Sequence, residues 1–500
     1  MHGGGSRTGG QEGRTGAESV IRDPRLSGSP PQTPEKDPEN RNDDARPERR
    51  GPPRGLRAVV SSFRHRNFRL FFVGQLISLV GTWMQNVAQG LLVFDLTHSA
   101  AWLGRVSAAG SLPMLFLTLY VGVVTDRRPK RALLVLTATA SMLLAFILTA
   151  LAYTKMVTVW HVMVLAFLLG SVNAFDMPAR QAFVIEMVGR EDLMNCIALN
   201  SAMFNGARIA GPAVAAQVLL ITGVAGCFFV NGLSYIAVIV ALLLMRLPAF
   251  VAPDQSRPAL GQMREAFIYI RQQPMTLTII ALMVIGGLFG APYQVLMPVY
   301  ARTILKVGAR GYGQLLSASG VGALLGAIAV SLLAHRPHKE RLFFLTVPVF
   351  TVASLAFTWS RWLPLSLALL VVASCMMMMQ FATANTLIQT YVPDELRGRV
   401  LSVYILAFQG TWPFGSFQLG QIAQWMGRPE IGTPRALTLS VTIYGLLAIS
   451  LLLARRRALA VTDGSRESSV VSCRKRIAER QARPQELTTN DNDSRQTTHD

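Results

Sequence analysis

The chain has 500 residues, of which 51% are apolar and only 15% are charged. This composition does not suit a soluble enzyme of that length and predicts a membrane protein. The net charge of +20 would suggest a nucleic-acid partner in a soluble protein. Most basic residues here stand in short loops and tails between apolar stretches, however, so no nucleic acid is expected. The four cysteines lie far apart, with neither CxxC spacing nor a paired His, so no disulfide framework, metal site or cofactor is expected.

Residues 1–66 form the first predicted segment and contain no apolar stretch. They are rich in Gly, Pro, Arg, Asp and Glu, which predicts a disordered tail. No signal peptide precedes the first apolar stretch, so that stretch is expected to direct membrane insertion. Residues 458–500 are predicted to form a second disordered tail.

Twelve apolar stretches between the tails are each about long enough to cross a bilayer. A spanning helix needs roughly 20 apolar residues, because the hydrocarbon core is about 30 Å thick. Each stretch is expected to be helical, since lipid offers no partner for a free backbone N–H or C=O. The predicted spans are Phe68–Phe94, Trp102–Val124, Arg131–Tyr153, Val157–Ala179, Leu193–Thr222, Val224–Leu247, Met275–Leu305, Gly311–Ala334, Leu342–Trp359, Leu363–Thr390, Val400–Met426 and Ala436–Leu453.

Basic residues are unevenly divided between the two sets of loops. The even-numbered loops carry clusters such as Arg127, Arg128 and Lys130, and Arg455–Arg457 follows the last span on the same side. The odd-numbered loops hold fewer basic residues. By the positive-inside rule, both termini are predicted to be cytoplasmic.

The longest internal loop divides the spans into six plus six. Within this loop, 248–274, the stretch Gly261–Arg271 has apolar residues at helical spacing, which predicts an amphipathic helix on the inner surface. Short elements recur in both halves, such as Ser107-Ala108 and Ser317-Ala318. We therefore predict helical halves at 67–247 and 275–457, an arrangement in which substrate binds between the halves.

The loop after the second span is the sharpest local signal. It reads Gly122-Val-Val-Thr-Asp126-Arg127-Arg128-Pro129-Lys130-Arg131. A carboxylate among cations at the interface can latch one conformation and release in another. The alternative is an ordinary basic loop with one stray acid. We predict a conformational latch formed by Gly122, Asp126, Arg127 and Arg131.

The order of residues in this loop resembles the signature of the major facilitator superfamily. The chain departs from that signature at Pro129, where Gly is usual, and the second half keeps only a degenerate copy at 335–341 without the Asp. The stretch from Gly170 to Pro212 resembles the enterobactin-exporter branch of the superfamily. It includes Asn173, Asp176-Met-Pro178-Ala-Arg180-Gln181, Asn200-Ser201 and Asn205-Gly-Ala-Arg208-Ile-Ala-Gly211-Pro212, and the whole resemblance runs from about Phe63 to Arg455.

This resemblance implies an all-α fold of twelve transmembrane helices in two six-helix halves. It also implies a secondary active transporter of the bacterial inner membrane that exports a small molecule, a siderophore or an amphipathic drug, in exchange for protons. An ATP-driven pump is not expected, because the chain has no phosphate-binding G-x-x-x-x-G-K-[ST] loop. An importer of the same fold and a non-transporting membrane scaffold remain alternatives.

Arg208 is the first residue that we assign a functional role. It lies about midway along the fifth span, where an unpaired charge costs at least about 2.5–3.5 kcal/mol. It must therefore face protein or water, either as a coupling or substrate-binding residue or as half of a structural ion pair. Gly211 and Pro212 form with it a motif that resembles the fifth-helix motif of proton-exchanging exporters, although alanines follow here where the family has glycines.

Proton coupling requires a titratable group, and the spans contain few. The candidates are Asp176, four residues before Arg180 and so in reach of it on a helix, and Asp95 near the outer end of the first span. Each is a proton relay or simply half of an ion pair.

Neutral polar side chains mark the predicted substrate path. Buried amides often only hold membrane helices together, but their number suggests a hydrated central route. The candidates are Trp83, Gln85, Gln89, Asn173, Asn205, Gln294, Gln380, Asn385 and Trp412. The Met376–Met379 run is interpreted as filler of the core or of the lipid-facing surface, because consecutive side chains point around a helix.

Overall fold

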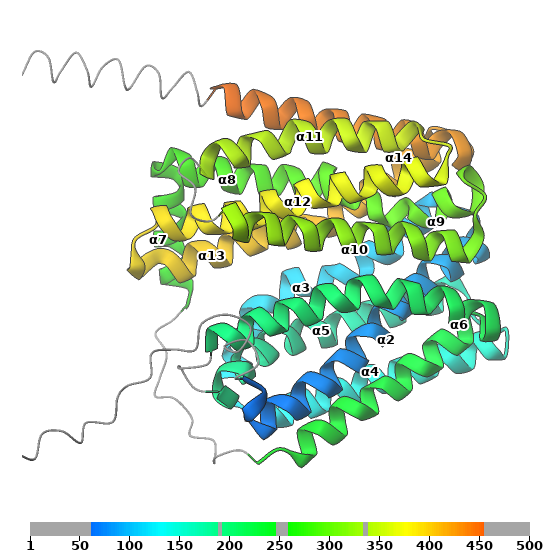
Figure 1. Cartoon of the computed structure of the whole chain (residues 1–500), viewed down its shortest axis with the longest axis horizontal. Coiled ribbons are helices and arrows are strands. Elements are labelled where there is room, and N and C mark those ends of the chain that lie inside the picture. Colours follow the sequence, from blue (N-terminus) through cyan, green and yellow to red (C-terminus); the bar gives the residue numbers. More distant parts are fainter. Residues whose placement is uncertain (1–61, 189–192, 247–258, 334–338, 455–500) are drawn as a thin grey trace, which may run out of the picture. The chain divides into compact units, whose positions relative to one another are not determined.

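The structure, a computed structural model, describes residues 62–188, 193–246, 259–333 and 339–454 (Figure 1). All regular secondary structure in these ranges is helical. The two predicted tails lie almost entirely outside them. The helices are α2 (Arg66–Thr97), α3 (Ala100–Arg127), α4 (Lys130–Tyr153), α5 (Val159–Val188), α6 (Leu193–Leu244), α7 (Ala259–Gln272), α8 (Pro274–Ile285), α9 (Met297–Val299), α10 (Gly308–Leu333), α11 (Lys339–Trp359), α12 (Leu363–Tyr391), α13 (Asp394–Gln409), α14 (Trp412–Trp425) and a last helix, Pro429–Ala454.

The described helices make twelve crossings, as predicted. Ten helical runs are long and apolar enough to span a membrane. One of them, α6, contains a non-helical residue, Gly223 (φ 68°, ψ −167°), where the chain turns back and the run divides into two spans. The short helices α13 and α14 follow each other across Gly410 and together make one more. The all-α fold with twelve transmembrane helices is therefore confirmed.

The seventh span changes its winding along its length. After α8 the chain forms a π-helix (Gly286–Gly290), a 3-10 turn (Ala291–Leu296), α9 and a second π-helix (Tyr300–Ile304). Pro292 and Pro298 remove two backbone donors, and such changes of winding often mark functional sites. This span faces the central cavity described below.

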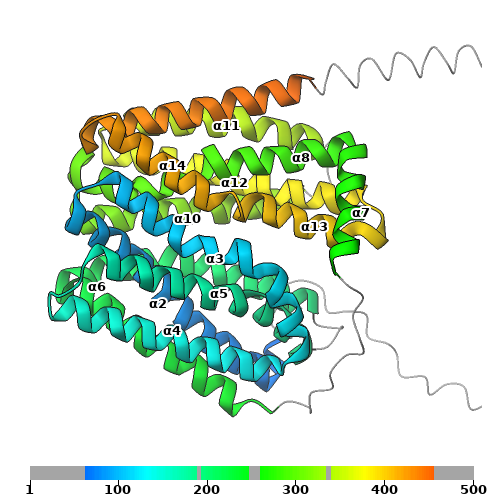
Figure 2. The ribbon, with the colours of Figure 1, turned by 180° about the vertical axis from the view of Figure 1, so that it is seen from behind.

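The helices form two groups, one above the other in Figure 1. Helices α2–α6 pack against one another and form the first group, and the helices from α8 to the last helix form the second. The groups meet mainly where α3 lies along α14 and α6 lies along α10. Helix α7 contains the stretch that was predicted to be an amphipathic helix, and it lies against α8 and α13 (Figure 2). The domain boundaries stay a prediction.

Glycines allow the two groups to approach at backbone distance. A Cβ atom added to Gly104 of α3 would lie 2.5 Å from the Ser416 carbonyl oxygen, and one added to Gly313 of α10 would lie 2.6 Å from that of Pro212. No side chain fits in those positions without moving a helix. Close packing of small residues of this kind is how membrane helices associate.

The two ends of the bundle differ in how the groups are joined. We call the end with Arg66, Leu244 and Ala454 the terminal end, and the other the far end. At the far end, side chains bond across the groups: Asp95 to Arg302 at 2.5 Å, Ser99 to Gln424 at 2.9 Å, Arg105 to Gln421 at 3.4 Å and Ser107 to Ser416 at 3.2 Å.

The buried core shows the same asymmetry. The far-end part of α2, from Met84 to Phe94, belongs to one apolar core with the second group. At the terminal end of the first group, a separate core contains Phe68, Phe183 and Met245. The molecule is therefore closed at the far end.

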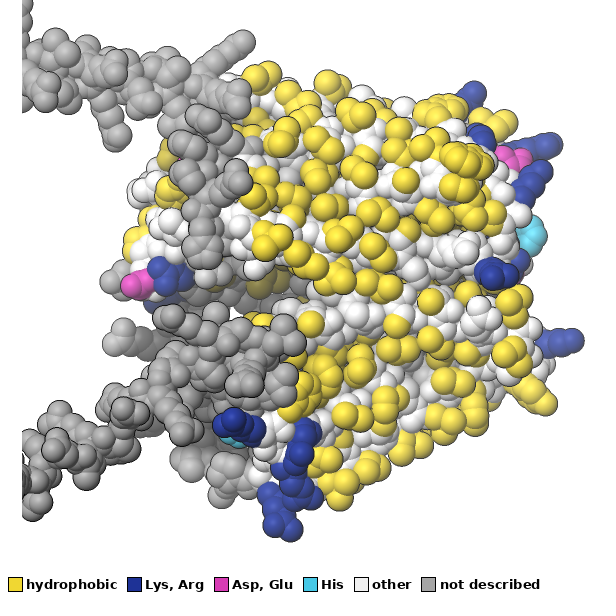
Figure 3. All heavy atoms as spheres, in the orientation of Figure 1, with side chains coloured by type: hydrophobic (Ala, Val, Ile, Leu, Met, Phe, Trp, Pro, Cys, Tyr) yellow, Lys and Arg dark blue, Asp and Glu magenta, His cyan; other side chains and the backbone are white. Residues whose placement is uncertain are grey.

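The surface of the described part suits a bilayer. On the face that Figure 3 shows, apolar side chains cover the sides of the helices, and the described charged side chains gather toward the two ends. Exposed tryptophans Trp160, Trp359, Trp362 and Trp425 all stand at helix ends of the far end. Tryptophan prefers the membrane–water interface, so these residues mark one boundary of the bilayer.

Candidate functional site

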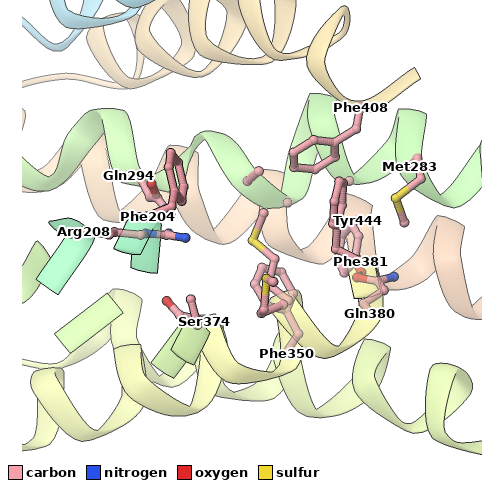
Figure 4. Close-up of a pocket in the computed structure, with 16 residues that line it drawn as sticks. Phe204, Arg208, Met283, Gln294, Phe350, Ser374, Gln380, Phe381, Phe408 and Tyr444 are labelled. Carbon is pink, nitrogen blue, oxygen red and sulfur yellow. The ribbon is translucent and has the colours of Figure 1, made fainter. Parts of the chain in front are cut away.

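A central cavity of about 270 Å³ is the main candidate site. Arg208 and Phe204 of α6 reach it from the first group, and all its other lining residues come from the second group (Figure 4). The lining residues are Phe204, Arg208, Met283, Gly286, Gly290, Ala291, Gln294, Ala323, Phe350, Ser374, Met377, Met378, Gln380, Phe381, Phe408 and Tyr444.

Aromatic rings and thioethers form most of the lining. The Phe381 and Phe408 rings meet edge to face with centroids 5.3 Å apart, and the Phe350 and Tyr444 rings do the same at 5.2 Å. Ligand pockets commonly combine such an apolar lining with a few polar groups that fix orientation. The cavity can therefore hold flat apolar groups.

Close packing between α2 and α6 positions Arg208. A Cβ atom on Gly211 would lie 2.3 Å from Cβ of Trp83, so the glycine lets α2 approach at this level. The Trp83 ring then lies beneath the Arg208 guanidinium, 5.7 Å from its carbon, and beside the Phe204 ring at 5.9 Å. This cation–π contact orients the Arg208 side chain.

Arg208 has no carboxylate partner among the described residues, where the ion pairs involve other side chains. The structural ion pair that was one of the predictions for Arg208 is therefore absent from this part of the chain. Pro212 lacks the N–H that would bond the Arg208 carbonyl, and α6 nevertheless stays helical through it. The cavity thus contains an arginine that contacts an aromatic ring and forms no ion pair within the described part of the chain.

Two buried hydrogen bonds order the polar part of the lining. The Tyr444 hydroxyl donates to Oε1 of Gln380 at 2.9 Å, while the Tyr293 and Ser374 hydroxyls are 3.0 Å apart. The Gln380 amide nitrogen is buried and has no hydrogen-bond partner among the described residues. These groups come from α12, the seventh span and the last helix, so they tie three spans of the second group together.

Some of the residues predicted to form the substrate path line the cavity, and the others do not. Only Gln294 and Gln380 line the cavity, while Trp83 and Trp412 each touch a ring that does. The other amides bond to protein or lie elsewhere: Gln85 accepts from Asn231 at 2.6 Å, Asn205 donates to the Ser201 carbonyl at 2.9 Å, Asn385 accepts from Gln389 at 2.9 Å, Asn173 is exposed on α5, and Gln89 is half-buried away from the lining.

The sequence prediction missed most of the apolar lining. Ser374, Met377, Met378 and Phe381 recur at i, i+3, i+4 and i+7 and share one face of α12. That spacing could have indicated a cavity-lining face from the sequence, but a search restricted to polar side chains does not detect it. Two of the four methionines that were interpreted as filler line the cavity.

The candidate carboxylates form ion pairs away from the cavity. Asp176 is 8% exposed, bonds to Arg180 one helical turn later and accepts a hydrogen bond from Thr137 at 2.9 Å. The contact expected from the spacing of Asp176 and Arg180 is therefore present, with Pro178 between them in α5. Asp95 pairs with Arg302 at the far end.

The predicted latch is only partly described. The side chains of Asp126 and Arg127 lie outside the described part, and of Gly122 only the helical backbone within α3 is described. The Arg131 guanidinium donates to the carbonyls of Leu243 at 2.8 Å and Met245 at 3.4 Å. A cation at the C-terminal end of a helix, here α6, is stabilising. The latch itself stays a prediction.

The comparison with protein families decides the assignment. Residues 58–481 match the model of the transmembrane secretion effector family of the major facilitator superfamily. The chain belongs to this family. It is a membrane transporter and not an enzyme, and its relatives include the exporters that the sequence resemblance indicated.

Three relatives illustrate the range of the family. The chain is 23% identical to a staphyloferrin A transporter of Staphylococcus aureus over 72% of this chain and 90% of the relative. It is 28% identical to the multidrug efflux pump Tap of Mycolicibacterium fortuitum over 76% and 95%, and 26% identical to the enterobactin exporter EntS of Escherichia coli over 78% and 91%.

A solved structure confirms the transporter fold. The chain matches a bacterial homologue of the human lysosomal transporter Spinster, in an inward-facing and unoccupied conformation, with a TM-score of 0.63. The match covers 79% of this chain and 98% of the other at 12% sequence identity, so it concerns the fold alone.

Proposed function

We propose that this transporter exports an amphipathic small molecule, a siderophore or a drug, across the bacterial inner membrane by alternating access and in exchange for protons. The observation that carries the proposal is the central cavity, in which Arg208 faces a lining of rings and thioethers. A molecule with flat apolar parts and one polar end fits this lining.

Arg208 favours an anionic substrate over a cationic one. Its charge is not neutralised by a carboxylate among the described residues, and a hydrogen bond between charged groups contributes about 1.5–3 kcal/mol. A substrate carboxylate or phenolate would supply that partner. A lipophilic cation would have to lie beside the guanidinium, so a catecholate-type anion is the better candidate of the two substrate classes considered.

Export is supported by the relatives and by the conformation. An efflux pump and an exporter are among the similar proteins. Closure at the far end leaves the terminal end as the loading side, and we propose that this side is cytoplasmic. The basic loops and the two tails support that orientation.

Proton exchange requires a carboxylate that can lose its partner. Asp176 is the buried carboxylate of the described spans, and protonation would remove its charge and release Arg180. We propose Asp176 as the proton-binding residue. Asp95 is the weaker candidate, because it is 43% exposed beside Arg302 at one end of the bundle.

Uptake into inside-out membrane vesicles tests the proposed function. A catecholate siderophore and tetraphenylphosphonium, a lipophilic cation, are compared with and without an imposed pH gradient. We expect gradient-dependent uptake of the siderophore by the wild type and none by Arg208→Ala. Uptake of tetraphenylphosphonium without uptake of the siderophore would contradict the proposal that the substrate is an anion. Equal uptake with and without the pH gradient would contradict proton exchange.

A further inference from the structure

Gln380 carries a feature that the proposed function does not use. Its side chain lines the cavity and is 5% exposed, yet its amide nitrogen has no hydrogen-bond partner in the part of the chain that the structure describes. A buried donor without a partner costs about 1–3 kcal/mol. A role in holding helices together does not explain why the nitrogen is buried, because among the described residues it is the amide oxygen that bonds to another span.

Tyr444 fixes the orientation of this amide. The tyrosine hydroxyl donates to the Gln380 oxygen at 2.9 Å, and the ring is fully buried against Phe350. With its oxygen held in this way, the amide leaves its N–H donors without a partner among the described residues. The donor is therefore preorganised, which lowers the entropy cost of binding a ligand.

Arg208 and Gln380 lie on different sides of the cavity. Figure 4 shows the guanidinium on one side and the Gln380–Tyr444 pair on the other, with aromatic side chains between them. The cavity thus offers a cation, an apolar middle and a neutral donor. A ligand that spans it meets all three.

We propose that Gln380 is a specificity-determining residue that donates a hydrogen bond to a neutral acceptor oxygen of the substrate, such as a ketone or amide carbonyl. The inference rests on the proposed function, since it concerns the substrate of the same cavity. It narrows the substrate class to aromatic anions that carry a carbonyl at a distance from the charge.

A matched pair of ligands tests the inference. 4-Benzoylbenzoate and 4-benzylbenzoate share the carboxylate and both rings, and differ only in a carbonyl group against a methylene group. Their dissociation constants are measured by calorimetry on the purified full chain and on Gln380→Met, which keeps the side-chain length and removes the amide.

For each protein, the affinity for 4-benzoylbenzoate is divided by the affinity for 4-benzylbenzoate. The deciding quantity is this ratio in the wild type divided by the same ratio in Gln380→Met. This quotient cancels the difference in hydrophobicity between the ligands. We expect a quotient of about five to ten, the effect of one hydrogen bond to a neutral group. A quotient near one, with both ligands bound, overturns the role of Gln380 and leaves the proposed function intact.

Two further readouts keep the test decisive. The carbonyl stretch of bound 4-benzoylbenzoate should move to lower frequency in the wild type, and this measurement requires no variant. An unshifted stretch overturns the inference even if Gln380→Met does not fold. If the wild type binds neither ligand, the proposed anion-binding cavity is contradicted and the inference falls with it.

Discussion

At the scale of single residues, Arg208 combines three features that rarely occur together in a membrane span: mid-span position, a cavity-lining side chain and no carboxylate partner among the described residues. Its orientation depends on Trp83, and Trp83 approaches only because Gly211 leaves room. A charge at this depth is costly. A substrate that supplies the counter-charge would reduce that cost each time it binds.

Replacement of Arg208 should remove anion binding without preventing membrane insertion. We expect Arg208→Ala to weaken binding of 4-benzoylbenzoate at least tenfold, the lower limit for a hydrogen bond between charged groups. Calorimetry measures the affinity, and size-exclusion chromatography checks folding. Arg69→Ala, an exposed position on α2, is the control. Poor folding of Arg208→Ala alone would favour a structural role instead.

Neutralisation of Asp176 should separate transport from the pH gradient. Asn keeps an acceptor for Thr137 but cannot form the ion pair with Arg180. In Asp176→Asn, uptake should no longer respond to the gradient, while ligand affinity stays within about threefold because the residue lies outside the cavity. Asp394→Asn, which likewise breaks an ion pair within one helix, here with Arg397, is the matched control. Uptake that still follows the gradient in Asp176→Asn would assign the proton elsewhere.

Residue-level prediction from the sequence was uneven for a physical reason. A charge in a span must be explained, so Arg208 could be singled out from sequence alone. An amide does not reveal whether it bonds to a neighbour, as Gln85 does, or faces a cavity, as Gln380 does. That difference depends on which helix lies opposite, which sequence spacing does not show.

At the scale of elements, the contact of α3 with α14 holds the far end closed. The backbones touch at Gly104 and Gly420, and polar pairs lie on either side of that contact along α3. The closed state depends on the absence of side chains at the two glycines. Opening of this contact is the movement that alternating access requires.

A side chain at Gly104 should therefore open the far end. The added atoms of Gly104→Val overlap the Ser416 carbonyl, and overpacking of this kind costs about 1–3 kcal/mol. We expect cross-linking of Ser99→Cys to Gln424→Cys, in a background without the four native cysteines, to fall roughly five- to hundredfold.

The control for this experiment is Gly206→Val on α6, where an added Cβ atom meets nothing within 4 Å. Its cross-linking should equal that of the parent. Unchanged cross-linking in Gly104→Val would show that α3 and α14 tolerate the side chain, and closure would then depend on other contacts.

Helix α7 is fastened to the second group by specific contacts. Glu265 pairs with Arg399 of α13, the Tyr269 hydroxyl donates to the Tyr391 carbonyl at 3.0 Å, and Ala266 and Ile270 are buried. Because of these contacts, α7, which connects the two groups in the sequence, should move together with the second group.

Loss of the Arg399 contact should loosen α7. In Arg399→Ala, hydrogen exchange of the α7 amides should rise about two- to fivefold, since a partly exposed ion pair contributes up to about 1 kcal/mol. Arg397→Ala is the matched control, because Arg397 pairs with Asp394 within α13. Equal exchange in both variants would mean that apolar packing alone holds α7.

At the scale of the whole molecule, the twelve spans could be predicted because lipid imposes length, apolarity and helicity on each of them. The helix ends could be predicted less well: the last helix begins at Pro429, seven residues before the predicted Ala436. The helix continues through polar residues beyond the apolar part of the span, and a search for apolar stretches does not include those residues. Which end is closed could not be predicted, since it depends on contacts between residues distant in sequence.

The measurement that tests the central claim most directly is transport by the purified chain in liposomes, which removes every other membrane protein. An imposed pH gradient is applied, and accumulation of 2,3-dihydroxybenzoylserine, an aromatic anion with a carbonyl group, is followed. The account predicts gradient-dependent accumulation by the wild type and none by Arg208→Ala. Equal accumulation by the two proteins, or accumulation that persists after the gradient is collapsed, would contradict it.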